Sequence, residues 1–398
     1  MKKFLLSLLM SAAIIAPTAA QQRSEAEAAS IANAFMQGNG YNFNITKAPK
    51  AKKVSTEKAG EITPYYIFND TQKGGFVIVG GQEGMSDILA YSVDECFDTD
   101  DLPPSAQMWL DIYAEVAKKA ADNPEAAKAE KKAKAKAFLE SNFSLRQNVE
   151  PLLGDINYGQ GNPYNRHCPK LAMVKSNGTE YEGQSIVGCT STALGSLMRY
   201  WKWPKHSIGE KEHTFHYKAG TVNGEEIKRP MTLYVNYDSV GEYEWDKMIP
   251  TYRNGGYTDE QADAVAKLMY HCGVAMQATY GTSGTGAALR PENVVKHFGY
   301  SSDYIGDNFG NYTNYDLYKF TLADELSQGR PIWCAGAGSN AAHSYICDGY
   351  DLNGLFHFNL GWNGSSNGYY EIAPTPTVPY GDGMYYFRHL HPVGKLTP

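Results

Sequence analysis

The sequence lacks the motifs that would mark a protein binding nucleotides, metals or nucleic acids. The glycine-rich stretch at 281–286 has no Gly-Lys-Ser/Thr ending, which disfavours a phosphate-binding loop. His206, His213 and His216 do not share helical spacing and no carboxylate pair frames them, which favours a surface loop over a metal site. A net charge of −7 gives no indication of a nucleic-acid partner. We therefore expect neither a metal nor an organic cofactor.

Long apolar runs are absent after the N-terminus, and the run at the N-terminus is short. Two lysines precede an apolar core from Phe4 to Ile15, and small residues at 18–20 follow it. This pattern predicts a signal peptide at 1–20. The run is too short to favour a membrane span, and no cysteine follows the cleavage site to carry a lipid. We expect an exported, secreted protein without a membrane anchor.

Cysteine is scarce, with six residues in the whole chain. In an exported protein, cysteines can form disulfides. Cys334 and Cys347 flank His343 on two candidate strands and could pair. Four free, buried thiols are an equally consistent alternative for the cysteines other than Cys96 and Cys189. Those four are Cys168, Cys272, Cys334 and Cys347.

The stretch around Cys189 predicts a helix that begins with a reactive cysteine. Apolar residues at Ala193, Leu197 and Trp201 recur at helical spacing, and Gly188 suits a tight turn before the helix. A thiolate in the first turn is stabilised by free backbone N–H groups and the helix dipole, and the thiolate is the nucleophilic form. A lone cysteine is more often a small core residue, so this interpretation depends on partners elsewhere in the chain.

Two residues far downstream complete a pattern typical of cysteine peptidases. His343 starts a strand-like run about 150 residues after Cys189, and Asn359 ends another. Cys, then His, then Asn is the order of a papain-type site. There the imidazole takes the thiol proton and later protonates the leaving amine, while the Asn oxygen holds the imidazole tautomer. Gln160, in a turn-rich loop before the helix, could donate its amide to an oxyanion together with the Cys189 N–H.

The first half of the chain predicts a small α+β domain without catalytic residues. Its expected elements are a capped amphipathic helix at 24–37, a hairpin with strands at 65–68 and 76–79, a third strand at 88–92, and a helix from Pro103. Residues 123–140 are dominated by Ala and Lys, which favour a helix, but this helix has no apolar face. We interpret it as a connector that proteases can reach, and place the domain boundary between it and about residue 147.

The second half predicts a helical part followed by an antiparallel sheet. The expected helices are at 189–201, 259–270, 291–298 and 322–326, and the expected strands are at 332–335, 343–350, 355–359 and 368–372. Cys189 belongs to the helical part, whereas His343 and Asn359 belong to the sheet. The expected site therefore lies in a cleft between the two parts.

These residues resemble the streptopain family, a bacterial branch of the papain-like cysteine peptidases. The likeness is carried by 158–165, 188–200, 249–252, 343–349 and 359–362, with a similar propeptide at 75–79 and 88–92. It covers nearly the whole chain. It implies an α+β fold: a papain-like two-part catalytic domain, with a helical half, an antiparallel sheet half and a cleft between them, preceded by a small α+β prodomain. The expected division is a signal peptide at 1–20, an inhibitory prodomain at 21–147 and a peptidase domain at 148–398.

The resemblance implies a role for each matching residue. Cys189 would be the nucleophile, and His343 the general base and acid. Asn359 would orient the imidazole, and Gln160 would donate to the oxyanion. Trp362 would cover the Asn–His contact and keep water from it.

The resemblance also implies a substrate cleft lined by small residues. Gly284, Gly286 and Ala342 would permit close approach of a peptide backbone. One position departs from the family pattern, because Leu360 stands where an aromatic Trp directly follows the Asn.

The expected function is hydrolysis of peptide bonds in proteins by a secreted cysteine endopeptidase made as a zymogen. Its partners would be protein or peptide substrates and its own prodomain, an inhibitor whose binding weakens as the pH falls and interface carboxylates protonate. Two alternatives remain open. A Cys-His amidase or transglutaminase would usually carry Asp where Asn359 stands, and a non-catalytic secreted binding protein would not need the four polar residues of the site.

Overall fold

The computed structural model describes most of the chain after the expected signal peptide. The described residues are 22–45, 53–140, 148–308, 315–337, 342–372 and 385–395. The expected signal peptide at 1–20 and the end of the expected linker, 141–147, lie outside these ranges. None of the helices in the described ranges has both the length and the apolar character needed to cross a bilayer.

The N-terminal domain has the elements predicted for it and two further short strands. Its elements are α1 (Glu25–Gly38), β1 (Val54–Ser55), β2 (Glu61–Ile62), β3 (Tyr65–Asn69), β4 (Phe76–Gly80), β5 (Ile88–Ser92), α2 (Pro104–Asp122) and α3 (Pro124–Glu140). A capping box starts α1, because the Ser24 side chain accepts from the Glu27 N–H while the Glu27 side chain accepts from the Ser24 N–H. The Tyr113 hydroxyl of α2 donates to Leu89 O at 2.7 Å and ties this helix to β5.

The Ala/Lys-rich segment forms α3, but this helix is not polar on every side. Ala127 is buried, and a Cβ on Gly84 would lie 2.5 Å from the Ala127 Cβ. Lys131 Nζ lies 2.6 Å from Asp87 Oδ1. The expectation of a helix without a docked face is therefore wrong for the first half of α3. Alanine allows close packing against a glycine, and the lysine charge is matched by carboxylates in the turn between β4 and β5.

The helical half of the second domain is built on two packed helices. Its elements are β6 (Lys170–Val174), β7 (Glu180–Gln184), α4 (Cys189–Trp201), β8 (Glu210–Val222), β9 (Glu225–Asn236), α5 (Asp259–Ala275) and α6 (Pro291–Phe298). Leu194 and Leu197 of α4 share a core with Leu268 and Met269 of α5. A Cβ on Gly195 would lie 2.7 Å from Met269 Sδ, so the missing side chain lets the two helices approach closely.

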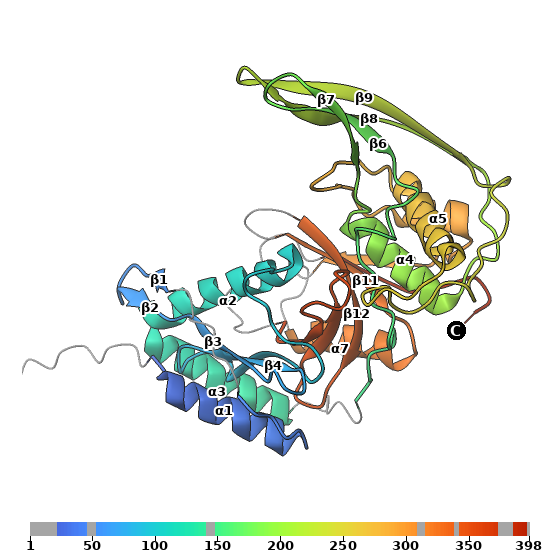
Figure 1. Ribbon diagram of the computed structural model, residues 1–398. Coiled ribbons are helices and arrows are strands. Elements are labelled where there is room, and N and C mark those ends of the chain that lie inside the picture. The colour runs from blue at the N-terminus through green and yellow to red at the C-terminus, as the bar shows by residue number, and fades with distance from the viewer. Residues whose placement is uncertain are drawn as a thin grey trace, which may run out of the picture.

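The β8–β9 hairpin forms a long arm that the sequence analysis did not predict (Figure 1). Phe215, Tyr217 and Ala219 are buried on β8, while His216 and Lys218 between them are exposed. His206 lies in an exposed loop, as expected, but His213 and His216 lie on β8, so the surface-loop interpretation is wrong for these two. Charged residues and threonines dilute the alternation of apolar residues along both strands, which hides the strand signal.

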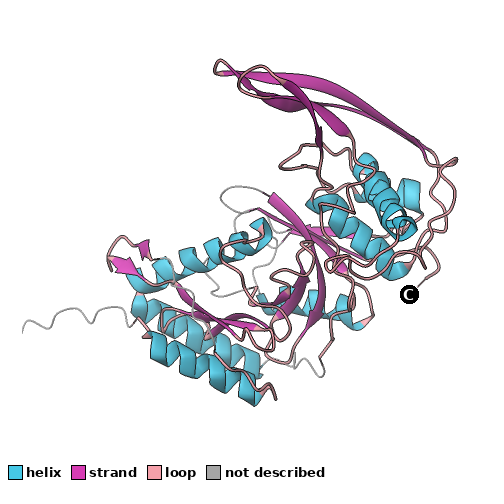
Figure 2. Ribbon diagram, in the orientation of Figure 1, coloured by secondary structure: helices cyan, strands magenta, loops and turns pink. Residues whose placement is uncertain are grey.

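One antiparallel sheet extends through both domains (Figure 2). The remaining elements are β10 (Ile305–Asn308), α7 (Tyr315–Ser327), β11 (Ile332–Ala337), β12 (Ala342–Tyr350), β13 (Phe356–Asn359), β14 (Gly368–Tyr370) and β15 (Tyr385–Arg388). The strand order is β10-β15-β11-β12-β13-β14-β5-β4-β3. The domains join where β14 pairs with β5, with Tyr369 opposite Tyr91 and Tyr370 opposite Ala90. The N-terminal domain thus extends the sheet of the second domain.

The two faces of this sheet carry different cores. On one face, Trp333 and Ile346 pack in a cluster with Leu197 of α4. On the other face, Tyr345 packs in a cluster with Trp109 of α2. Successive side chains of a strand point to opposite faces. The face on which any other residue of β11 or β12 lies therefore follows from whether it is an even or odd number of positions from Trp333, Ile346 or Tyr345 on its own strand.

Candidate active site

Cys189 is the first residue of α4. Gly188 makes the turn before it with φ of +86°, and a Cβ there would lie 2.6 Å from Thr285 O. The Cys189 thiol is free and partly buried. At this position the free N–H groups of the first helical turn and the helix dipole stabilise a thiolate. The local structure therefore suits a nucleophile.

The other five cysteines are also free in the structure. Cys334 lies opposite Tyr345 and Cys347 opposite Ile332, so these two thiols are buried on neighbouring strands without being paired. Burial raises the pKa of Cys168 and of Cys334 to about 12. These buried thiols stay protonated at neutral pH, which separates them chemically from a reactive cysteine.

His343 lies on β12, on the face of the sheet away from α4. It pairs with Gly336 of β11, and a Cβ on Gly336 would lie 2.9 Å from both Met108 Sδ and the Tyr345 hydroxyl. Cross-strand partners point to the same face, so His343 shares the face that α2 covers. Its ring forms a hydrogen bond with none of the described residues, and burial lowers its pKa. The structure thus separates this imidazole from Cys189.

Asn359 lies on β13 and faces α4. It stands opposite Ile346, which belongs to the α4 side of the sheet. Its Nδ2 donates to Ile156 O at 2.7 Å, and its Oδ1 accepts from the Gly361 N–H at 3.2 Å. Both ends of the amide are therefore engaged by the backbone, and neither binds His343.

A second pair of asparagines holds the same segment, and the sequence analysis did not single them out. Asn367 Nδ2 donates to Asn157 Oδ1 at 2.8 Å, while Asn367 Oδ1 accepts from the Leu360 N–H at 2.9 Å. Asn359 Nδ2 lies 3.4 Å from the same Asn157 oxygen. Loop asparagines are common in turns, so nothing in the sequence distinguished these two.

Gln160 lies beside the start of α4 with an unused donor. Its carbonyl accepts from the Val187 N–H at 3.0 Å, which fixes the loop against the residues before Cys189. The side chain is buried, and its Nε2 has no hydrogen-bond partner among the described residues. A buried donor left unpaired costs about 1–3 kcal/mol. Such a donor suits an acceptor that arrives with the substrate, such as a developing oxyanion.

Leu360 and Trp362 belong to the cluster that α2 covers. Leu360 is fully buried there with Trp109 and Tyr370, and Trp362 packs against the same cluster. Since Asn359 and His343 make no contact in this arrangement, the Trp362 ring does not cover one. Leu360 occupies a core position here.

The small residues expected to line a substrate cleft are all exposed at the surface. Gly284 and Gly286 border open space, because a Cβ on either meets no atom within 4 Å. Thr285 between them donates its hydroxyl to Ile186 O at 2.7 Å, which holds this loop close to the start of α4. Ala342 is exposed at the first position of β12.

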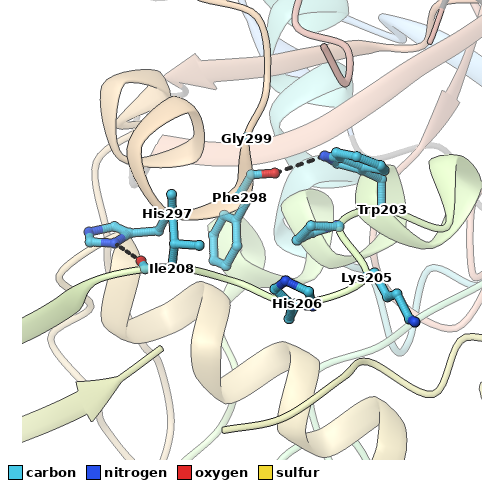
Figure 3. Close-up of a pocket in the computed structure, with 8 residues that line it drawn as sticks. Trp203, Lys205, His206, Ile208, His297, Phe298 and Gly299 are labelled. Carbon is cyan, nitrogen blue, oxygen red and sulfur yellow. Dashed lines mark hydrogen bonds between the residues drawn. The ribbon is translucent and has the colours of Figure 1, made fainter. Parts of the chain in front are cut away.

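A separate pocket of about 250 Å³ lies beyond the far end of α4 (Figure 3). It is lined by Trp203, Pro204, Lys205, His206, Ile208, His297, Phe298 and Gly299. Trp203 Nε1 donates to Phe298 O at 2.9 Å, and His297 Nδ1 donates to Ile208 O at 3.0 Å. A helix of this length separates the pocket from Cys189 by roughly 20 Å. Within the described ranges, no three His, Cys, Asp or Glu side chains gather as a metal site.

Comparisons with known proteins match both parts of this chain. A family model described as peptidase C10 family matches residues 158–370, and one described as Spi protease inhibitor matches residues 20–117. Streptopain of Streptococcus pyogenes serotype M1 is 30% identical over 370 residues, covering 91% of this chain and 87% of streptopain. The thiol protease/hemagglutinin PrtT of Porphyromonas gingivalis is 27% identical over 320 residues, covering 77% of this chain and 34% of PrtT.

A solved structure supports the same relationship. A fragment of Prevotella intermedia prointerpain A superposes with a TM-score of 0.65 at 27% identity, covering 88% of this chain and 99% of the fragment. This confirms the predicted papain-like α+β fold with an N-terminal propeptide domain. The family match spans more than half of the chain, and the chain therefore belongs to the peptidase C10 family, as a cysteine peptidase with an inhibitor-type propeptide domain.

Proposed function

We propose that Cys189 is the nucleophile of this cysteine endopeptidase and that the zymogen is latent because His343 is held on the wrong face of the sheet. The observation that carries the proposal is the pairing of His343 with Gly336, which faces Met108 of the prodomain. Family membership identifies the chain as a cysteine peptidase. It leaves the amidase, transglutaminase and binding-protein alternatives without support.

In the active arrangement, His343 reaches the α4 side of the sheet and takes the proton of the Cys189 thiol. The thiolate adds to the scissile carbonyl, and the Gln160 amide and the Cys189 N–H stabilise the oxyanion. The imidazolium then protonates the leaving amine. Water hydrolyses the resulting thioester to the acid product and the free thiol. Asn359 orients the imidazole during these steps, and Trp362 shields their contact.

Two side-chain contacts between the prodomain and the peptidase domain support the latency proposal. The Tyr91 hydroxyl donates to Asp351 at 2.8 Å, inside the protein. Glu95 binds Arg253 at 2.6 Å, and a Cβ on Gly364, in the loop that carries Trp362, would lie 3.2 Å from Glu95 Oε1. We propose an inhibitory prodomain at 21–147 and a peptidase domain at 148–398; this division falls between the two ranges that the family models match, 20–117 and 158–370.

Substrates and location follow from the same proposal. We expect protein or peptide substrates, lying along a cleft bordered by Gly284, Gly286 and Ala342. The charged and apolar pattern at 1–20 supports export by a signal peptide, and the chain would act outside the cytoplasm.

A peptidyl epoxide that alkylates peptidase thiols tests the proposed nucleophile. We expect it to modify Cys189 after the linker is cut and to leave the uncut precursor unmodified, because His343 and Cys189 are apart in the precursor. Peptide mapping by mass spectrometry locates the modified thiol. Modification of another cysteine, with loss of activity, would reject the assignment. Equal labelling before and after cleavage would reject the latency mechanism.

The pH dependence of prodomain release is expected to follow the protonation of the His343 imidazole. Its pKa is lowered by burial in the docked state, so docking loses stability as the pH falls through the ordinary histidine range near about 6.5. Burial raises the pKa of Glu95 and of Asp351, so protonation of these carboxylates favours docking at lower pH. Acid therefore weakens docking through the histidine, and the carboxylates act in the opposite direction to that expected from the sequence.

A cut but catalytically inactive chain measures this effect. Sedimentation of cleaved Cys189→Ala protein should show dissociation rising between neutral and mildly acidic pH, by at most about tenfold per pH unit for one proton. The same protein with His343→Gln should lose this dependence. A pH profile unchanged by His343→Gln would contradict the assignment.

A further inference from the structure

The carboxamide of Asn363 lies flat against the backbone that carries Gln160. A Cβ built on Gly159 would lie 2.5 Å from both Asn363 Nδ2 and Asn363 Oδ1, and 2.6 Å from Asn363 Cγ. Three atoms of one planar group at nearly equal distance place that plane face-on to the glycine. Non-bonded heavy atoms pack favourably at roughly 3.5–4.0 Å. A side chain at 159 and the amide at 363 therefore compete for one space.

Glycine is required at position 159 because the Asn363 amide leaves no room for a side chain there, and not because the backbone has a positive φ. Gly159 does not have a positive φ, whereas Asn363 has φ of +55°. The left-handed conformation is one that asparagine adopts more readily than most residues. The Asn363 N–H also donates to Tyr158 O at 3.0 Å. Both the backbone and the side chain of Asn363 thus contact the two residues before Gln160.

The segment 158–160 is held from two sides. From the α4 side, the Val187 N–H donates to Gln160 O at 3.0 Å, and the Thr192 hydroxyl lies 3.4 Å from Gly159 O. From the sheet side, the contact is made by Asn363. The Gln160 Nε2 has no partner among the described residues, so no hydrogen bond to them fixes its direction. The position of the Gln160 side-chain amide therefore depends on how firmly the backbone of this segment is held.

We propose that Asn363 is a positioning residue for the oxyanion donor Gln160, matched in size to Gly159. The inference rests on the function proposed above for Gln160. An oxyanion donor acts only within a narrow distance of the developing charge, and loss of one donor typically lowers kcat by about 10²–10³. A displaced loop reduces the same stabilisation without touching the thiol.

Four variants, made as full chains and processed with removable immobilised wild-type enzyme, test this proposal. Gly159→Ala should lower kcat by about tenfold or more with little change in KM, because the new methyl group displaces the loop. Gly159→Ala combined with Asn363→Gly should recover kcat to the level of Asn363→Gly alone. Gly161→Ala is the matched control, since a Cβ there meets no atom within 4 Å. Alkylation of the thiol by iodoacetamide should proceed at the wild-type rate in all four.

Gln160→Ala separates failure of this inference from failure of the proposed function. If Gln160→Ala lowers kcat and Gly159→Ala leaves it within about twofold of wild type, the positioning role is rejected alone. If Gln160→Ala has no effect on kcat, the oxyanion role of Gln160 and the positioning role of Asn363 are both rejected. If Gly159→Ala does not fold, the kcat of the Gly159→Ala, Asn363→Gly double variant decides whether the positioning role holds. A kcat that equals that of Asn363→Gly and exceeds that of Gln160→Ala supports the proposal, and a kcat no higher than that of Gln160→Ala overturns it.

Discussion

Replacing Cys189 by alanine is expected to reduce peptidase activity by about 10³-fold or more. The substitution removes the atom that forms the thioester, and no other thiol can take its place because the remaining core cysteines are buried and protonated. Alanine is a good helix former at the start of α4, so the fold should be retained. The full chain should also stay unprocessed if the same thiol carries out maturation.

Casein hydrolysis, the mass of the chain over time and thermal unfolding measure these outcomes together. Cys96→Ala provides the matched control, because Cys96 is also free and partly buried but lies in the prodomain. That variant should mature and act as the wild type does. Retention of even a few per cent of wild-type turnover by a folded Cys189→Ala protein would exclude Cys189 as the nucleophile.

Replacing Trp109 by alanine is expected to activate the uncut chain. Trp109 is fully buried in α2, with its ring centroid 5.3 Å from that of Phe358 and 5.4 Å from that of Tyr370. Truncation of a buried Trp typically costs about 3–5 kcal/mol, which corresponds to two or more orders of magnitude in the equilibrium between docked and undocked prodomain. With α2 loosened, His343 is no longer held beneath it.

Labelling of the uncut chain by a peptidyl epoxide reports this activation directly. Glu115→Ala is the control on the same helix, because Glu115 is exposed and its ion pair within the described part of the chain is with nearby Lys118. It should leave labelling and maturation rates unchanged. A folded Trp109→Ala chain that stays unlabelled and matures at the wild-type rate would show that α2 does not hold the enzyme latent.

Local sequence signals predicted the elements that position the proposed nucleophile. Gly188 at a turn and the apolar spacing after Cys189 predicted α4, and the structure begins that helix at Cys189. The Ser24 signal likewise predicted the start of α1, which the capping box confirms. These features depend on residues within one or two helical turns of each other, so the sequence contains all the information they need.

Features set by distant pairing were not predictable in the same way. The face on which His343 lies depends on its register with Gly336 and on the packing of Met108 there. A shift of one residue in register would move every side chain of β12 to the other face. The union of the two domains depends on pairing between β5 and β14, whose residues lie far apart along the chain. No local pattern encodes either feature.

The shared sheet has a consequence for the mature enzyme. While the prodomain is docked, β14 is an interior strand with neighbours on both sides, β13 and β5. Departure of the prodomain turns β14 into an edge strand with unpaired backbone N–H and C=O groups. Exposed edges invite pairing with other chains, and natural proteins limit this by keeping edge strands very short. At three residues, Gly368–Tyr370, β14 offers the released enzyme little surface for self-association.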